Sequence, residues 1–296
     1  MINSYKNYCG MRVRCFLLVC VLFAGICLKA PVCSAAKSKD PVELTQDTLK
    51  DVIMLVPETT FLVDLNGDGK KDKVLFKSTT DEDAFTADFK LYINGKLCLH
   101  KAQDNSFGFN VQLCNLDTSD NSLDLYIEAR QDSDGVAYSS FATYDGKAVV
   151  ENEFNPDMVS KYFSTFRYSL GEVKGDKTIQ FIADTPIYTE TIGCYYCNLE
   201  FQINDNNITA VPTSSFEFGQ YTKDYKYKTS KSFKVYDKAG SNTSVFTVSK
   251  GSTVTFDKLY ITKSGKAYVR VINSKGKKGW INAGLNNLFK NRPFWG

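Results

Sequence analysis

The strongest constraint on the fold is an internal repeat with a period of about fifty residues, a pattern typical of arrays of similar small units. The first copy spans residues 61–96 and the second spans residues 113–147. Each reads apolar strand, acidic loop, apolar strand, and a last strand that closes on Asx-Gly-Lys. A weaker third copy runs from residue 166 to residue 207. Aromatic and β-branched residues alternate with polar ones between frequent turn signals, so the sequence predicts an all-β chain.

The acidic loop of the first copy, residues 64–72, is the best candidate for a metal site. Oxygen donors stand at its positions one, three, five, seven and nine: Asp64, Asn66, Asp68, the backbone carbonyl of Lys70, and Asp72. This spacing suits Ca²⁺. An EF-hand would need flanking helices and a glutamate at position twelve, where Leu75 stands. The alternative is an acidic, Gly-rich hairpin turn without a metal.

The repeats resemble the FG-GAP or VCBS-type repeats of integrin-like β-propellers, through the pattern Asp64-x-Asn66-x-Asp68-Gly69-x-x-Asp72. The resemblance covers residues 52–212. It implies blades that bind calcium between their strands through Asp64, Asn66, Asp68 and Asp72. The second loop, from Asp117 to Asp124, is shorter and lacks glycine, so we assign it no metal. Three units are too few for a closed propeller of four or more blades. We therefore expect a partial propeller-like or sandwich domain over residues 52–221.

Residues 1–35 are typical of a secretion signal. Residues 1–14, which end at Arg14, contain no acid. Residues 16–28 form an apolar run that is shorter than a membrane span. The small residues Ala35 and Ala36 suit cleavage of the signal. An uncleaved anchor is the alternative. Residues 36–51 follow as a spacer, and we expect a short helix from Asp47 to Leu55 with Thr45 or Asp47 as its cap. No later apolar run is long enough to cross a bilayer.

Four cysteines follow the signal: Cys98, Cys114, Cys194 and Cys197. A secreted protein can form disulfides, and structural bridges or buried thiols are both open here. The CxxC pair at the end of this series lies among strand formers, which disfavours a thioredoxin-like site.

Charge is divided between two parts of the chain. From Thr222 onward there are 16 lysines and arginines and 3 acids, a net charge of +13. Residues 36–221 hold 16 basic and 30 acidic residues, a net charge of −14. This asymmetry predicts two domains with different partners.

The basic part resembles a bacterial SH3-like domain over residues 226–283. The resemblance rests on Lys250-Gly251, on the strand at residues 268–271, and on Gly276-x-x-Gly279-Trp280-Ile281. It implies a small barrel, and residues 284–296 form an apolar tail that we expect to pack back onto it.

This basic part also carries the second candidate site. The residues are Lys275, Lys277 and Lys278 in one turn, Trp280 after it, and Arg270 on the preceding strand. Aromatic rings beside cations bind sugars, peptides or anionic polymers. The SH3-like resemblance favours peptidoglycan or another envelope polymer. The alternative is a solvated face with Trp280 in the core. No nucleic-acid motif is present, so we do not expect a nucleic acid as the partner.

Nothing in the sequence marks an active site. His100 is the single histidine, and because no nucleophile motif lies near it, we expect it on a strand surface. A carboxylate pair for glycoside hydrolysis would have to be hidden among 33 acids. We therefore expect no catalytic residue and no bound group other than one calcium ion.

Together these patterns predict a secreted, non-enzymatic binding protein of the cell wall or envelope. Its repeat domain would be stabilised by calcium, and its SH3-like domain would attach it to an envelope polymer. The alternative function is a cell-wall or glycan hydrolase, or an inactive relative, that uses a carboxylate pair. A third possibility is that the two oppositely charged domains dock on each other.

Overall fold

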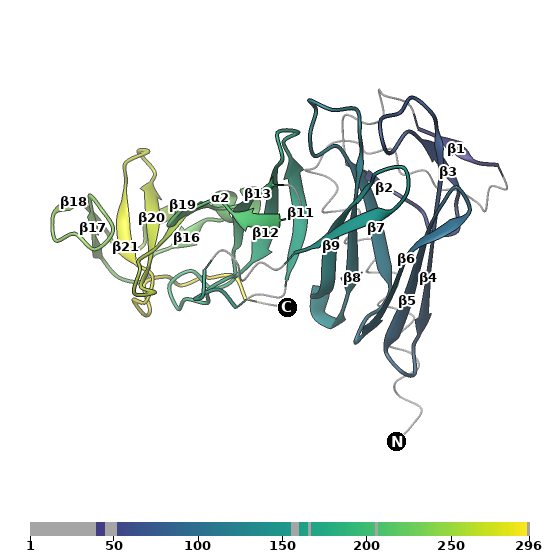
Figure 1. Ribbon diagram of the computed structural model, residues 1–296. Helices are drawn as coiled ribbons and strands as arrows, with labels where there is room; N and C mark the ends of the chain where they lie inside the picture. The colour runs from purple at the N-terminus through teal and green to yellow at the C-terminus, as the bar shows by residue number, and fades with distance from the viewer. Residues whose placement is uncertain (1–39, 45–51, 155–159, 165–166, 205–206, 295–296) are drawn as a thin grey trace, which may run out of the picture.

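The structure is a computed structural model that describes residues 40–44, 52–154, 160–164, 167–204 and 207–294. The predicted signal and most of the predicted spacer, including the start of the helix expected from Asp47 to Leu55, lie outside these residues. The described end of that helix is wrong, because Ile53 and Met54 pair with another strand as β2 (Ile53–Met54). The described chain is almost entirely β, which confirms the all-β prediction. Its strands form four sheets, which follow one another in a row in Figure 1, with the first and fourth sheets at opposite ends.

The first two sheets have five strands each. Only β1 and β3 pair in parallel; the other neighbouring strands are antiparallel. The first sheet has the order β1 (Val42–Glu43), β3 (Phe61–Val63), β4 (Asp72–Asp81), β5 (Thr86–Ile93), β6 (Lys96–Asp104). The second sheet has the order β10 (Val149–Glu153), β9 (Val136–Tyr144), β8 (Asp124–Arg130), β7 (Phe109–Cys114), β2 (Ile53–Met54). A 3-10 helix, η2 (Asp132–Asp134), joins β8 to β9.

The last two sheets are antiparallel. The third sheet has the order β11 (Tyr168–Val173), β12 (Thr178–Asp184), β13 (Tyr196–Asn204), β14 (Asn207–Ala210). The fourth sheet has the order β15 (Ser215–Glu217), β19 (Thr253–Ile261), β20 (Ala267–Asn273), β21 (Lys278–Asn282), β17 (Phe233–Tyr236), β18 (Ser244–Val248). The strand β16 (Tyr227–Lys228) also pairs with β19, and the short helix α2 (Gln220–Asp224) precedes it. Among the described residues this sheet is an open path, so the expected closed barrel is not confirmed.

Each sequence repeat lies largely within a longer run of four consecutive strands whose neighbours are antiparallel, namely β3–β6, β7–β10 and β11–β14. Side chains alternate between the two faces of each strand, which explains which of them are buried. On β5, Ala87, Phe89 and Leu91 are buried, and the residues between them are only partly buried. The hairpin from β5 to β6 turns at Asn94 and Gly95, which both have positive φ, as a two-residue type I′ turn requires.

The second sheet is buried on both faces. On β8, Leu125 and Ile127 belong to a core shared with the first sheet, and Tyr126 belongs to a core shared with the third. The ring of Tyr126 lies 5.7 Å from that of Phe181 on β12. The core that the second sheet shares with the third sheet continues into the fourth sheet. Among the described residues, the first and fourth sheets therefore each keep one outward face.

The tail after β21 packs against the fourth sheet, as expected. The ring of Phe289 lies 5.3 Å from that of Tyr227 and 5.5 Å from that of Phe256. The tail also reaches the third sheet, because the backbone N–H of Cys194 donates to the carbonyl of Pro293 at 3.0 Å. No helix among the described residues is both long enough and apolar enough to cross a membrane.

Candidate functional site

The loop between β3 and β4 is wound around the carboxylate of Asp64. This carboxylate accepts hydrogen bonds from the backbone N–H groups of Gly67 at 2.8 Å, Asp68 at 3.2 Å and Gly69 at 2.8 Å. The two glycines have φ of 73° and 83°, a left-handed conformation that a residue with a Cβ rarely adopts. The first candidate site is therefore a preformed turn whose shape depends on its first residue.

Asp72 closes the same loop from the other side. It is buried, and its Oδ2 accepts a hydrogen bond from the backbone N–H of Leu65 at 3.1 Å. Its Oδ1 accepts one from the amide of Asn94 at 2.7 Å. Asp68 is exposed and its Oδ1 accepts only the backbone N–H of Lys70, at 2.8 Å. Asp72 thus ties the loop to the β5–β6 turn.

The fit of this loop to calcium is partial. Within the described residues, no three histidine, cysteine, aspartate or glutamate side chains are grouped so that they could hold a metal ion. An ionised carboxylate offers about four acceptor positions, so Asp64 with three N–H donors and Asp72 with two keep some capacity. Asp68, whose Oδ1 accepts one N–H, also keeps acceptor capacity.

The second loop, between β7 and β8, reuses the same scaffold with different chemistry. The backbone N–H of Leu116 donates to Oδ2 of Asp124 at 3.3 Å, as that of Leu65 does to Asp72. The hydroxyl of Thr143 donates to Oδ1 of Asp124 at 2.5 Å. Burial raises the pKa of Asp124 in spite of these hydrogen bonds.

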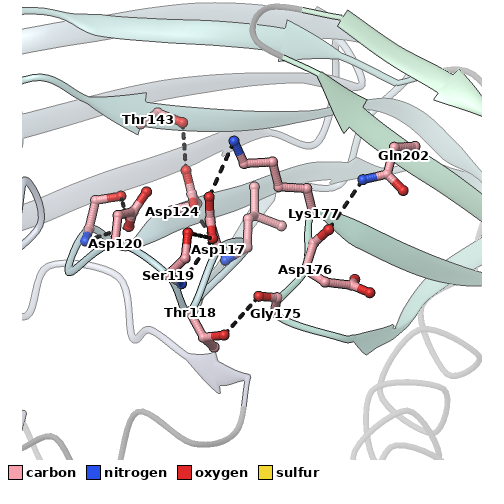
Figure 2. Close-up of polar contacts among 12 residues, drawn as sticks. Asp117, Thr118, Ser119, Asp120, Asp124, Thr143, Gly175, Asp176, Lys177 and Gln202 are labelled. Carbon is pink, nitrogen blue, oxygen red and sulfur yellow. Dashed lines mark hydrogen bonds and ion pairs between the residues drawn. The ribbon is translucent and has the colours of Figure 1, made fainter.

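Figure 2 shows Asp117 of the second loop between Ser119 of its own loop and Lys177 of the next repeat. Asp117 Oδ1 accepts the N–H of Ser119 at 2.9 Å and its hydroxyl at 2.5 Å. The Lys177 Nζ lies 3.2 Å from Asp117 Oδ2. The hydrogen bonds from Ser119, and then the one from Lys177, lower the pKa of Asp117. The second loop therefore receives a cation, the Lys177 ammonium, from the next repeat.

The loops of successive repeats touch one another. The N–H of Leu123 donates to the carbonyl of Leu65 at 2.8 Å, and that of Lys177 donates to the carbonyl of Leu116 at 2.7 Å. Leu123 and Lys177 therefore occupy equivalent backbone positions in successive repeats. The side chain at this position is apolar in the second repeat and cationic in the third. The contact of Lys177 with Asp117 could not be predicted from the sequence, because the two residues are far apart in the chain.

The second candidate site lies on the outward face of the fourth sheet. Arg270 of β20 pairs with Trp280 of β21, and the guanidinium lies 5.8 Å from the centre of the indole ring. The ring of Tyr260 lies 6.0 Å from that of Trp280 and 6.5 Å from that of Tyr268. Trp280 is only partly buried, so the alternative that placed it in the core is wrong. We call these four residues the aromatic face.

The lysines predicted for this site lie beside the aromatic face. Lys278 begins β21, and Lys275 and Lys277 are exposed in the turn between β20 and β21. The structure thus brings Arg270, Lys278 and Trp280 together.

Asp257 is a member of this site that the sequence did not reveal. It lies where the pairing of β19 with β20 shifts register, and it is buried. Its oxygens accept hydrogen bonds from Arg270 Nε and Nη2, each at 2.7 Å, and from Lys278 Nζ at 3.0 Å. Burial opposes ionisation, but the bonds from Arg270 and Lys278 outweigh it, so the pKa of Asp257 is lowered. An acid inside a predominantly apolar stretch of the basic part of the chain was the available signal.

The remaining predicted positions are His100 and the cysteines. His100 is exposed on β6, as expected, and its Nε2 lies 2.6 Å from Oδ2 of Asp88. Cys98, Cys114 and Cys197 are free thiols, and burial raises the pKa of Cys114 and Cys197. The buried-thiol alternative therefore describes these last two.

Comparison of the chain with models of protein families, with curated proteins and with solved structures finds no match. The proposals below therefore rest on the residues and their geometry.

Proposed function

We propose that this protein is a secreted, non-enzymatic binding protein that attaches to an anionic polymer of the cell wall or envelope through the aromatic face. The observation that carries the proposal is the guanidinium of Arg270 above the ring of Trp280, on an outward sheet face beside three lysines. The high positive charge of the part from Thr222 onward supports an anionic partner.

The aromatic face offers two kinds of contact. The rings of Trp280, Tyr260 and Tyr268 can stack on the apolar faces of sugar rings, while Arg270 and the turn lysines attract negative groups. Asp257 holds Nε and Nη2 of Arg270, which fixes the guanidinium plane and leaves Nη1 for a ligand. Asp257 is a positioning residue in this account.

Retention on purified cell wall tests the proposal. The wild-type protein should be retained at low salt and released as salt is raised, because exposed charges are screened. Trp280→Ala and Arg270→Ala should each weaken retention, so that the variants are released at lower salt than the wild-type protein. Lys250→Ala, which removes an exposed lysine from another turn of the same part, should not change retention. Equal retention of all four proteins would refute the proposal.

We propose further that the first three sheets form an open, partial propeller and that the fourth is an SH3-like module. The four-strand order of each repeat and the burial of the second sheet on both faces support this interpretation. The repeats would act as a spacer that carries the binding face.

We also propose that the loop at Asp64 takes up calcium. Among the described residues, no lysine or arginine forms an ion pair with Asp64, Asp68 or Asp72, whereas Asp117 of the second loop has Lys177. When bound, calcium would neutralise the loop carboxylates and hold Asp68 against them. The dependence of the melting temperature on calcium tests this proposal.

A further inference from the structure

The outward face of the first sheet contains a groove of about 350 Å³, at the small end of the range of ligand sites. It is lined by Thr60, Lys73, Leu75, Lys77, Tyr92 and Gly95. On β4 the residues between the lining positions, Val74 and Phe76, point into the core. The register of β4 with β5 places Leu75 opposite Tyr92, so these two form an apolar floor.

Two unneutralised lysines stand beside this floor. Lys73 and Lys77 are exposed, and neither forms an ion pair with an acid of the described chain. Three lysines in or beside the first sheet are paired, Lys71 with Glu43, Lys90 with Asp88, and Lys101 with Glu151, whereas Lys96 donates to the carbonyl of Lys147. The groove is therefore a local positive site in a part of the chain whose net charge is −14. An anionic ligand complements it.

The groove repeats the arrangement of the aromatic face. Nζ of Lys77 lies 5.9 Å from the centre of the Tyr92 ring, as the guanidinium of Arg270 lies 5.8 Å from the ring of Trp280. Both pairs lie on neighbouring strands of an outward sheet face, and the two sheets lie at opposite ends of the row in Figure 1. The two ends thus offer the same chemistry.

We infer that the groove is a second site for a sugar ring that bears a negative charge, so that the protein holds an anionic polysaccharide at both ends. The floor contacts the ring face, and Lys73 and Lys77 bind its carboxylate or phosphate. The inference rests on the proposed function of the aromatic face. Two sites on one scaffold raise the avidity for a long chain and allow two chains to be bridged, without any new contact.

Titration calorimetry on the full chain tests this inference, with a galacturonate hexamer as the carboxylate probe and an oligomer of mannose 6-phosphate as the phosphate probe. The wild-type protein should bind one of the probes at two sites. The triple variant Lys73→Ala, Lys77→Ala, Tyr92→Ala should keep only the aromatic-face site. The double variant Arg270→Ala, Trp280→Ala should keep only the groove. The methyl-esterified hexamer should bind at least tenfold more weakly to each site.

The controls separate the two proposals. Lys71→Ala and Lys90→Ala remove paired lysines of the same sheet and should leave both sites intact. Leu75→Glu should remove the groove site alone, by placing a carboxylate in its floor. Two remaining sites in the triple variant would overturn the groove and leave the aromatic face standing. Two remaining sites in the double variant would overturn the aromatic face. Failure of the wild-type protein to bind either probe would overturn both.

Discussion

Nζ of Lys177 lies 3.2 Å from the carboxylate of Asp117, across the boundary between the third and second repeats. The loop at Asp64 receives no such cation from the described residues, although its backbone scaffold is the same. The two loops therefore provide an internal comparison for the role of a cation at this edge of the repeats.

The calcium proposal predicts that Asp68→Ala lowers the melting temperature in calcium and leaves it nearly unchanged in chelator. A ligand that binds only the folded state stabilises it by mass action, and Asp68 otherwise accepts just one N–H. Thermal melts of both proteins in calcium and in chelator check this. Asp120→Ala, in the second loop, is the matched control and should not alter the response to calcium. A wild-type melting temperature that ignores calcium would refute the proposal.

Lys177→Met is expected to make the stability of the protein less sensitive to salt. It removes the exposed ammonium beside Asp117 but keeps a long side chain and the backbone N–H that donates to Leu116. Melting temperatures at low and high salt measure this. At high salt the variant and the wild-type protein should converge, because screening has already weakened the pair. A constant difference at all salt concentrations would show that Lys177 acts by packing instead.

Asp257→Asn should destabilise the fold by about 1–3 kcal/mol at pH 7, since it removes charged acceptors from Arg270 and Lys278. The pKa of Asp257 is lower in the folded state than in the unfolded state. The stabilisation is therefore complete above the ordinary carboxyl pKa of about 4 and is lost as the pH falls through the folded value. Urea unfolding at pH 7 and pH 3 should show the difference between the proteins shrinking at acid pH. An equal difference at both values would contradict this account.

Phe181→Ala should cost about 3–5 kcal/mol, the usual effect of emptying a buried aromatic site. Phe181 is fully buried, and its ring stacks 3.9 Å from that of Phe154. Denaturant unfolding measures the change. Phe107→Ala, at a side chain that is 54% exposed, is the control and should change stability by no more than about 0.5 kcal/mol. Similar costs for both would mean that the second and third sheets do not share the core described above.

The sequence predicted those features that depend on local pattern. Alternation located the strands, and the apolar tail was expected to pack back where Phe289 does. The open path of the fourth sheet and the entry of β15 into it were not predicted, because strand pairing is decided by tertiary contacts.

The candidate site was predicted in the same partial way. Arg270, Lys278 and Trp280 could be grouped because they stand on two strands joined by one turn. The contact of Asp257 with them depends on a register shift in β19, and local spacing does not reveal such a shift.

The measurement that most directly tests the central claim is the fluorescence of Trp280. The chain has two tryptophans, so Trp295→Phe leaves Trp280 as the single reporter. Titration with the anionic oligomer that the protein binds should change this emission saturably at low salt, and the change should weaken as salt is raised. Arg270→Ala in the same background should lose the response. Binding of the oligomer with no change in Trp280 emission, or a response that Arg270→Ala leaves intact, would contradict the claim that the aromatic face holds the polymer.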